Sequence, residues 1–317
     1  MKNVVRTGAR ILAILAGGML LIIWYLYARD YHNYFVERKG ELATAHIREA
    51  GEDSLFQKLW LTLENTDGFK VECGMLVPQR RTGHEERRYP AIVLAGGKAT
   101  GKYAIDYAFD IRDVIIVSPD YPYEPRESYT FWNFLADVPA MRRALVDMVP
   151  STMLLTDYLH RRDDVDTSKL VMLGYSFGAP LVPVVVAYDK RFAVAAMVYG
   201  GGDLGSMIRH NVNRYEKPPV GAFVGLLSGL LLRPVEPMRY VGQISPTPLL
   251  MINGTNDEQI PRENTLMFYD RANQPKKIVW LESQHVNVTN VELTRRIIHT
   301  LGRELIAMRV LDSSIVE

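Results

Sequence analysis

Residues Lys169 to Gly178 read KLVMLGYSFG, and this stretch decides the fold class that the chain is expected to adopt. Its first half is a short apolar run, typical of a strand buried on both faces of a parallel sheet. Its second half has the spacing Gly-x-Ser-x-Gly, which is typical of a sharp turn from a strand into a helix that leaves a serine hydroxyl exposed. Glycines are needed on both sides of Ser176 because side chains there would collide within the turn. The pentapeptide alone is also compatible with an ordinary glycine-rich turn. Residues elsewhere in the chain must therefore indicate whether Ser176 is a nucleophile.

Other apolar runs of similar length lie on both sides of this stretch, and each ends at Gly, Pro or Asp. Helix-period stretches, notably 134–161 and 286–309, lie between several of them. Two strand-like stretches within 55–77 meet at Asp67-Gly68, which indicates a hairpin. This alternation predicts a doubly wound, mostly parallel α/β sheet with right-handed crossovers. The further runs are AIVLAGG (91–97), DVIIVSPDY (113–121), FAVAAMVYGGG (192–202), PLLMING (248–254) and KKIVWLES (276–283).

An acid and a histidine follow the last two of these runs. A serine hydroxyl becomes a good nucleophile only when a histidine accepts its proton, and an acid must hold the histidine in the correct tautomer. Asp257 follows the run at 248–254, and His285 follows the run at 276–283. Both lie where open α/β sheets place their sites, at the carboxyl ends of strands. Glu258 and Asp203 are rivals for the acid.

With these residues in place, the chain resembles the α/β-hydrolase superfamily, and within it the dienelactone-hydrolase-like and prolyl-oligopeptidase-like serine hydrolases. The resemblance covers about residues 55–305 and implies Ser176 as nucleophile, Asp257 as acid and His285 as base, with no metal and no cofactor. It rests on DTSKLVMLGYSFG (166–178), on GTNDEQIP (254–261) and on Ser-Gln-His at 283–285.

Backbone N–H groups are expected to bind the oxyanion of the reaction. One donor is the Phe177 N–H, and the second should come from the loop after the run at 91–97. Gly97 and Lys98 are the candidates there, although many relatives carry His-Gly at this place and this chain does not.

Aromatic residues after the run at 113–121 are expected either to line an apolar substrate pocket or to pack over the edge of the sheet. The candidates for substrate contact are Tyr121, Tyr123 and Trp132. A longer insertion, 203–247, contains the uncharged run VGAFVGLLSGLLL (220–232). It is expected to form a lid, to touch a membrane surface, or simply to be a buried helix.

The amino-terminal residues predict a membrane anchor. Ile11–Ala28 is an uncharged apolar run that would be about 27 Å long as a helix, close to the ~30 Å hydrocarbon core of a bilayer. Basic residues precede the run, and Trp24, Tyr25 and Tyr27 cluster at its far end. We therefore expect residues 1–40 to be a single-pass transmembrane anchor and linker, and residues 41–317 to be the catalytic domain. The charge bias predicts that this domain lies outside the cytoplasm.

Composition narrows the class of function. The 317 residues carry 37 Lys and Arg against 36 Asp and Glu, a net charge of +1, which gives no electrostatic reason to expect a nucleic-acid partner. A single cysteine, Cys73, excludes an intramolecular disulfide.

Taken together, the motifs and the resemblance predict a serine hydrolase acting on a small-molecule carboxylic ester, with an apolar acyl or aryl part. A short-form peptidase of the prolyl-oligopeptidase type and a non-catalytic, hydrolase-like binding domain are the alternatives, and the oligomeric state is not predicted.

Overall fold

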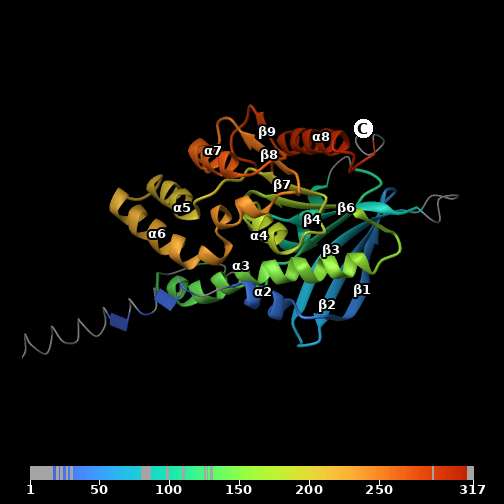
Figure 1. Cartoon of the computed structure of the whole chain (residues 1–317), viewed down its shortest axis with the longest axis horizontal. Helices are drawn as coiled ribbons and strands as arrows, with labels where there is room; N and C mark the ends of the chain where they lie inside the picture. Colours follow the sequence, from blue (N-terminus) through green and yellow to red (C-terminus); the bar gives the residue numbers. More distant parts are fainter. Residues whose placement is uncertain are drawn as a thin grey trace, which may run out of the picture.

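A computed structural model shows a nine-stranded sheet with helices on both faces (Figure 1). The structure describes residues 17, 18, 21, 24, 25, 28, 31–79, 87–97, 100–108, 111–124, 126, 128, 131–287 and 289–312. The strands are β1 (Leu42–Glu52), β2 (Phe56–Asn65), β3 (Lys70–Pro78), β4 (Tyr89–Ala95), β5 (Ile115–Pro119), β6 (Val165–Tyr175), β7 (Val194–Val198), β8 (Leu249–Gly254) and β9 (Lys276–Leu281). The helices are α2 (His32–Lys39), α3 (Phe131–His160), α4 (Leu181–Tyr188), α5 (Leu204–Asn213), α6 (Pro218–Leu231), α7 (Arg262–Arg271) and α8 (Val291–Ala307), with short 3₁₀ turns that include η1 (Gly101–Tyr107) and η2 (Ser176–Gly178).

The sheet has the order β1-β2-β3-β5-β4-β6-β7-β8-β9. The first three strands form an antiparallel meander, β3 pairs antiparallel with β5, and the strands from β5 to β9 along the sheet are parallel. Strand β6 lies between β4 and β7, with Gly174 paired to Ala95 on one side and to Met197 on the other. The residue that follows β6, Ser176, therefore lies near the middle of the carboxyl edge of the parallel strands. This is the α/β-hydrolase fold that the sequence predicts.

Two hydrophobic cores enclose the sheet. Strands β5, β7 and β8 are buried along their whole length, which explains their continuous apolar sequences. One core contains side chains of α2, α3, α4 and α7, and the other contains side chains of η1 and α8. By contrast, β1 is an edge strand on which only Leu42 is buried, so its sequence carries no apolar run.

Three prolines lie inside helices α3 and α4, and the structure explains the one in α4. Pro183 is the third residue of α4, because the helix begins at Leu181. An N–H at that position would have no partner within the helix, so proline costs little there. Helix α3 continues through Pro139 and Pro150, where the sequence predicts a helix over 134–161.

The prediction of a transmembrane helix is wrong. Among the residues that the structure describes, no helix is both long enough and apolar enough to cross a membrane. Most of Ile11–Ala28, on which the prediction rests, lies outside the described residues. The prediction of single-pass membrane anchoring with an extracytoplasmic domain is wrong for the same reason. The division of the chain into two parts at residue 40 stays a prediction.

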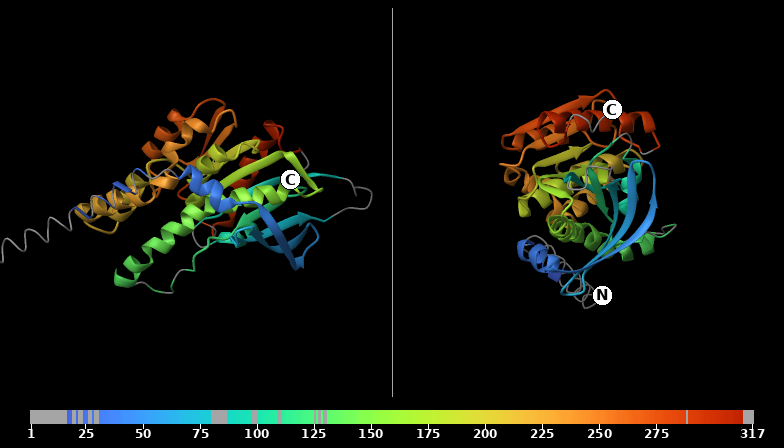
Figure 2. Two further views of the ribbon diagram at one scale, coloured as in Figure 1. Left: turned by 60° about the horizontal axis from the view of Figure 1, so that its bottom comes forward. Right: turned by 90° about the vertical axis from the view of Figure 1, so that its right-hand side faces the viewer.

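Residues just before position 40 pack onto the domain. Helix α2 places Phe35 and Tyr31 in the same core as α3 and α4, and the Phe35 ring meets the Tyr188 ring edge-on at a centroid distance of 5.1 Å. Figure 2 shows α2 lying beside α3. The segment around Phe35 is therefore part of the folded domain.

The insertion after β7 forms a helical hairpin. Helices α5 and α6 lie side by side and extend beyond the end of the sheet (Figures 1 and 2). Glycines permit their close approach, since a Cβ at Gly225 would lie 2.6 Å from the carbonyl oxygen of Gly205.

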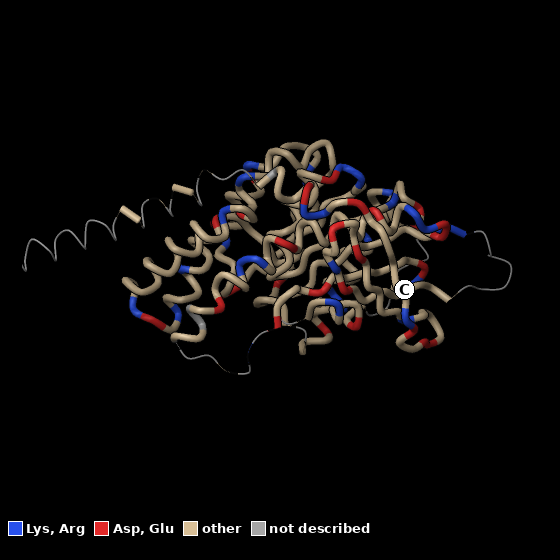
Figure 3. Tube along the Cα trace, turned by 90° about the horizontal axis from the view of Figure 1, so that it is seen from below, with Lys and Arg blue, Asp and Glu red and all other residues tan. Residues whose placement is uncertain are grey.

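Lysine and arginine are interspersed with aspartate and glutamate over the molecule, whereas α6 itself carries no charge (Figure 3).

Replacing Phe35 with alanine tests whether α2 is part of the core. Because Phe35 is fully buried, we expect Phe35→Ala to lower the free energy of unfolding by about 3–5 kcal/mol in chemical denaturation. Val36, which is 46% exposed on the same helix, provides the matched control, and Val36→Ala should change stability by less than about 0.5 kcal/mol. A loss below about 1 kcal/mol for Phe35→Ala would show that α2 is dispensable to the core.

Candidate active site

Ser176 lies at the turn between β6 and α4 with a left-handed backbone, φ 51°. Such a conformation strains a residue that has a Cβ, and it survives only where the surroundings impose it. Here Gly174 and Gly178 impose it by close packing. A Cβ at Gly174 would lie 2.5 Å from the carbonyl oxygen of Gly178, and a Cβ at Gly178 would clash with the carbonyl oxygen of Ala95. The turn thus lies directly against the end of β4, with the hydroxyl projecting beyond the sheet.

The structure brings the three residues predicted as the triad into one line of hydrogen bonds. Ser176 Oγ lies 2.7 Å from His285 Nε2. His285 Nδ1 lies 2.8 Å from Asp257 Oδ2 and 2.9 Å from Asp257 Oδ1. The side chains of His285 and Asp257 are only 5% and 2% exposed. Little water therefore competes for these bonds.

The carboxylate of Asp257 is fixed by its own loop. Its Oδ1 accepts hydrogen bonds from the backbone N–H groups of Gln259 (2.8 Å) and Ile260 (2.9 Å). These bonds hold the carboxylate toward the imidazole. A proton on Nδ1 then leaves Nε2 free to accept the proton of the serine hydroxyl.

The loops after β8 and β9 are joined to each other, and this sets the distance between acid and histidine. The Thr255 N–H donates to Leu281 O at 2.8 Å, and the Asn256 N–H donates to Ser283 O at 3.0 Å. A Cβ at Gly254 would lie 2.7 Å from Ser283 O, so the two backbones touch.

Glu258 supports the histidine loop and is not the partner of the imidazole. Its Oε2 accepts a hydrogen bond from the backbone N–H of His285 at 3.1 Å. Partial burial works to raise the pKa of the Glu258 carboxyl, but backbone hydrogen bonds, that from His285 first, outweigh it and lower the pKa. The other rival, Asp203, caps α5 by accepting a hydrogen bond from the Ser206 N–H at 3.0 Å.

Tyr199, at the end of β7, is a neighbour of the site that the sequence analysis missed. Its ring meets the imidazole of His285 edge-on, with centroids 5.5 Å apart and an interplanar angle of 85°. Its hydroxyl is hydrogen-bonded to Ser283 Oγ, two residues before His285. Burial raises the pKa of Tyr199, so the hydroxyl stays protonated. Its position directly after a buried apolar run was the signal that could have identified it.

The predicted oxyanion donors fall on neighbouring strand ends. Phe177 follows the serine in η2, in a first turn where backbone N–H groups have no partner within the helix. Gly97 follows β4, and a Cβ placed on it would lie 3.9 Å from Tyr175 O. Lys98, the other candidate in this loop, lies outside the described residues.

Of the predicted pocket residues, Tyr121 lies beside the serine turn. Its ring meets the Phe177 ring edge-on at 5.5 Å, and its hydroxyl donates to Gly96 O at 2.7 Å. Burial raises the pKa of Tyr121 and keeps it a donor. Tyr123 donates to Asp137 Oδ2 at 3.1 Å, and Trp132 on α3 is 75% exposed.

Within the described part of the chain, no group of three or more His, Cys, Asp or Glu side chains is arranged to hold a metal ion.

Comparisons with known proteins concern the fold and the family of this chain. Residues 146–286 match the prolyl oligopeptidase family. The folded chain is similar to acetyl xylan esterase 1 of Thermoanaerobacterium sp. JW/SL YS485, with a TM-score of 0.57 and 14% identity over 85% of this chain and 93% of the esterase. This chain shares the α/β-hydrolase fold with that esterase. The resemblance to prolyl-oligopeptidase-like serine hydrolases that the sequence predicts is thereby confirmed.

Two further matches extend the comparison. An acylaminoacyl peptidase is similar in structure, with a TM-score of 0.57 and 16% identity over 79% of this chain and 41% of the peptidase. The uncharacterized protein YfhR of Escherichia coli O157:H7 is 25% identical over 142 residues, which cover 44% of this chain and 46% of YfhR. The match thus spans about half the length of that relative.

The packing of Gly178 yields a test of the serine turn. Because a Cβ at Gly178 would meet backbone atoms of β4, Gly178→Ala should displace the turn, lower stability by about 1–3 kcal/mol and reduce labelling of Ser176 by a fluorophosphonate more than tenfold. Gly97→Ala is the control for stability, since a Cβ there meets only ordinary contact distances. Equal stability losses in the two variants would contradict the close packing described here.

Proposed function

We propose that this protein is a serine hydrolase that cleaves a carboxylic ester through an acyl-enzyme. Ser176 is the nucleophile, His285 the general base and acid, and Asp257 the residue that orients the imidazole. The observation that carries the proposal is the continuous line from Ser176 Oγ through the imidazole to the Asp257 carboxylate, with contacts of 2.7 Å and 2.8 Å. These are the distances at which a proton passes between a hydroxyl and a base.

The chemistry follows from this line of atoms. Ser176 Oγ attacks the carbonyl carbon while its proton moves to His285 Nε2, and the resulting imidazolium is stabilised by Asp257. The negative charge that develops on the carbonyl oxygen is bound by the Phe177 N–H and by the loop at Gly97. The tetrahedral intermediate expels the alcohol, which takes the proton from Nε2. Water then attacks the acyl group by the same route and releases the carboxylic acid.

A small ester substrate is favoured by the surroundings of the serine. The Tyr121 and Phe177 rings lie against each other beside the serine turn and offer an apolar surface to an acyl or aryl group. Two of the similar solved structures are described as acetyl xylan esterases, and ester cleavage by this chain is proposed partly on that likeness.

A peptidase activity is the second candidate, because residues 146–286 match the prolyl oligopeptidase family and an acylaminoacyl peptidase is among the similar structures. Both reactions use the same acyl-enzyme chemistry, so the leaving group distinguishes them. A non-catalytic binding domain is the remaining alternative.

Variants of the triad test the enzymatic assignment. Ser176→Ala should abolish fluorophosphonate labelling, and Asp257→Asn should lower kcat for a p-nitrophenyl ester by about 10⁴-fold, because the imidazole is then held in the wrong tautomer. Asp203→Asn is the matched control and should leave kcat unchanged, since asparagine caps a helix as well as aspartate does. Labelling that persists in Ser176→Ala would place the nucleophile elsewhere, and no labelling of the unmodified protein would support the binding-domain alternative.

A substrate panel tests the leaving group. We expect hydrolysis of p-nitrophenyl esters of varied acyl length, with kcat/KM at least tenfold higher than for aminoacyl p-nitroanilides that carry the same chromophore. Steady-state rates on matched pairs provide the measurement. A higher kcat/KM for the amides would favour the peptidase.

A further inference from the structure

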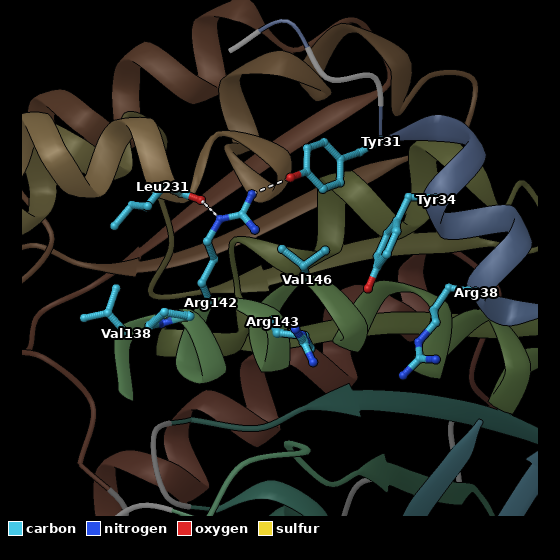
Figure 4. A pocket seen from close by; sticks show the side chains of 9 residues that line it. Tyr31, Tyr34, Arg38, Val138, Arg142, Arg143, Val146 and Leu231 are labelled. Carbon is cyan, nitrogen blue, oxygen red and sulfur yellow. Dashed lines mark hydrogen bonds between the residues drawn. The ribbon is translucent and has the colours of Figure 1, made fainter. Parts of the chain in front are cut away.

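A cavity of about 560 Å³ lies apart from the serine site, between α2, α3 and the end of α6. None of the three triad residues lines it. Its volume is within the ~300–1,000 Å³ range of sites that bind small molecules. Figure 4 shows residues of α2 on one side and residues of α3 below, with Leu231 at the far end. The lining residues are Tyr31, Tyr34, Arg38, Val138, Pro139, Arg142, Arg143, Val146 and Leu231.

Positive charge is in excess around this cavity. Its lining includes three arginines and no acidic side chain. Arg38 is paired with Asp147, whose side chain is 4% exposed and whose Oδ2 lies 3.4 Å from Arg38 Nη2. The hydroxyl of Tyr34 also donates to Asp147, and burial first and this bond second raise the pKa of Tyr34 to about 12. Tyr34 is therefore neutral, and of the three arginines in the lining only Arg38 forms an ion pair with this buried carboxylate among the described residues.

Arg142 is held in place without losing its charge. Its Nε donates to Leu231 O, the last carbonyl of α6, at 2.7 Å, and its Nη2 donates to the Tyr31 hydroxyl. Both acceptors are uncharged, so these bonds fix the guanidinium but do not neutralise it. A cation fixed in this way loses little entropy when it binds an anion.

Arg143 has no counter-ion either. Within the described part of the chain it forms no hydrogen bond and no ion pair, and it also lines a smaller neighbouring cavity of about 390 Å³. Figure 4 shows Arg143 and Val146 between the Arg142 end and the Tyr34 end of the cavity.

The remaining lining is apolar and consists of Val138, Pro139, Val146 and Leu231. A ligand that suits both parts carries one compact anionic group for the guanidiniums and a hydrocarbon part for the apolar wall. We propose that this cavity binds an amphiphilic anion, a carboxylate or phosphate headgroup attached to a short hydrocarbon chain. The site is independent of the chemistry at Ser176.

Titration calorimetry on the full-length protein tests this site with n-octyl phosphate and with octanoate, which separate the two headgroups. At least one of them should bind saturably, and inorganic phosphate should bind at least tenfold more weakly than n-octyl phosphate. Arg143→Gln should weaken binding about tenfold, because one charge-assisted contact is lost. Since Arg143 is exposed and forms no bond to the described residues, the variant should melt at the temperature of the unmodified protein.

Arg303→Gln is the control, because Arg303 is an exposed arginine on α8, which packs in the other core. It should leave the affinity unchanged. Arg142→Gln combined with Arg143→Gln should weaken binding further. The proposal is overturned if neither amphiphile binds, if Arg143→Gln binds with unchanged affinity, if Arg303→Gln causes an equal loss, or if inorganic phosphate binds as tightly as n-octyl phosphate.

Discussion

The left-handed backbone at Ser176 is the constraint on which the rest of the site depends. With φ at 51°, Ser176 starts the turn that follows β6, and its hydroxyl lies at the carboxyl edge of the sheet. This conformation is unfavourable for any residue other than glycine, so packing must hold it. The absence of side chains at Gly174 and Gly178 lets the turn lie against α4 and the end of β4, and these contacts leave the serine no other arrangement.

The imidazole reaches the hydroxyl because two distant loops are joined. Strands β8 and β9 pair in parallel, and their loops continue the pairing through Thr255 and Asn256. The joined loops therefore fix the distance between Asp257 and His285. Glu258 accepts a hydrogen bond from the backbone N–H of His285, and the Tyr199 ring packs against the imidazole. The strained turn and the joined loops are linked by the hydrogen bond between Ser176 Oγ and His285 Nε2.

The sequence predicted those parts of the molecule that local chemistry dictates. A Gly-x-Ser-x-Gly turn after a buried strand is a steric requirement of few residues, and Asp257 and His285 follow apolar runs whose parallel pairing places them at the same edge. By contrast, β1 escaped notice because an exposed edge strand needs no apolar pattern, and Tyr199 because one tyrosine after a strand is common. The cavity beside α2 depends on Tyr31 and Arg142, which are far apart in the chain and meet only through tertiary packing. The membrane prediction rested on the hydropathy of one amino-terminal run and on its basic and aromatic flanks, and it was wrong, because no described helix is long and apolar enough to cross a membrane.

The most direct measurement of the central claim is the mass of the protein quenched within the first turnover of a p-nitrophenyl ester, followed by peptide mapping. If Ser176 is the nucleophile, the mass increases by one acyl group on the peptide that contains Ser176, and this increase disappears as the acyl-enzyme is hydrolysed. Ester turnover with no acyl adduct, or with the acyl group on another residue, would contradict it.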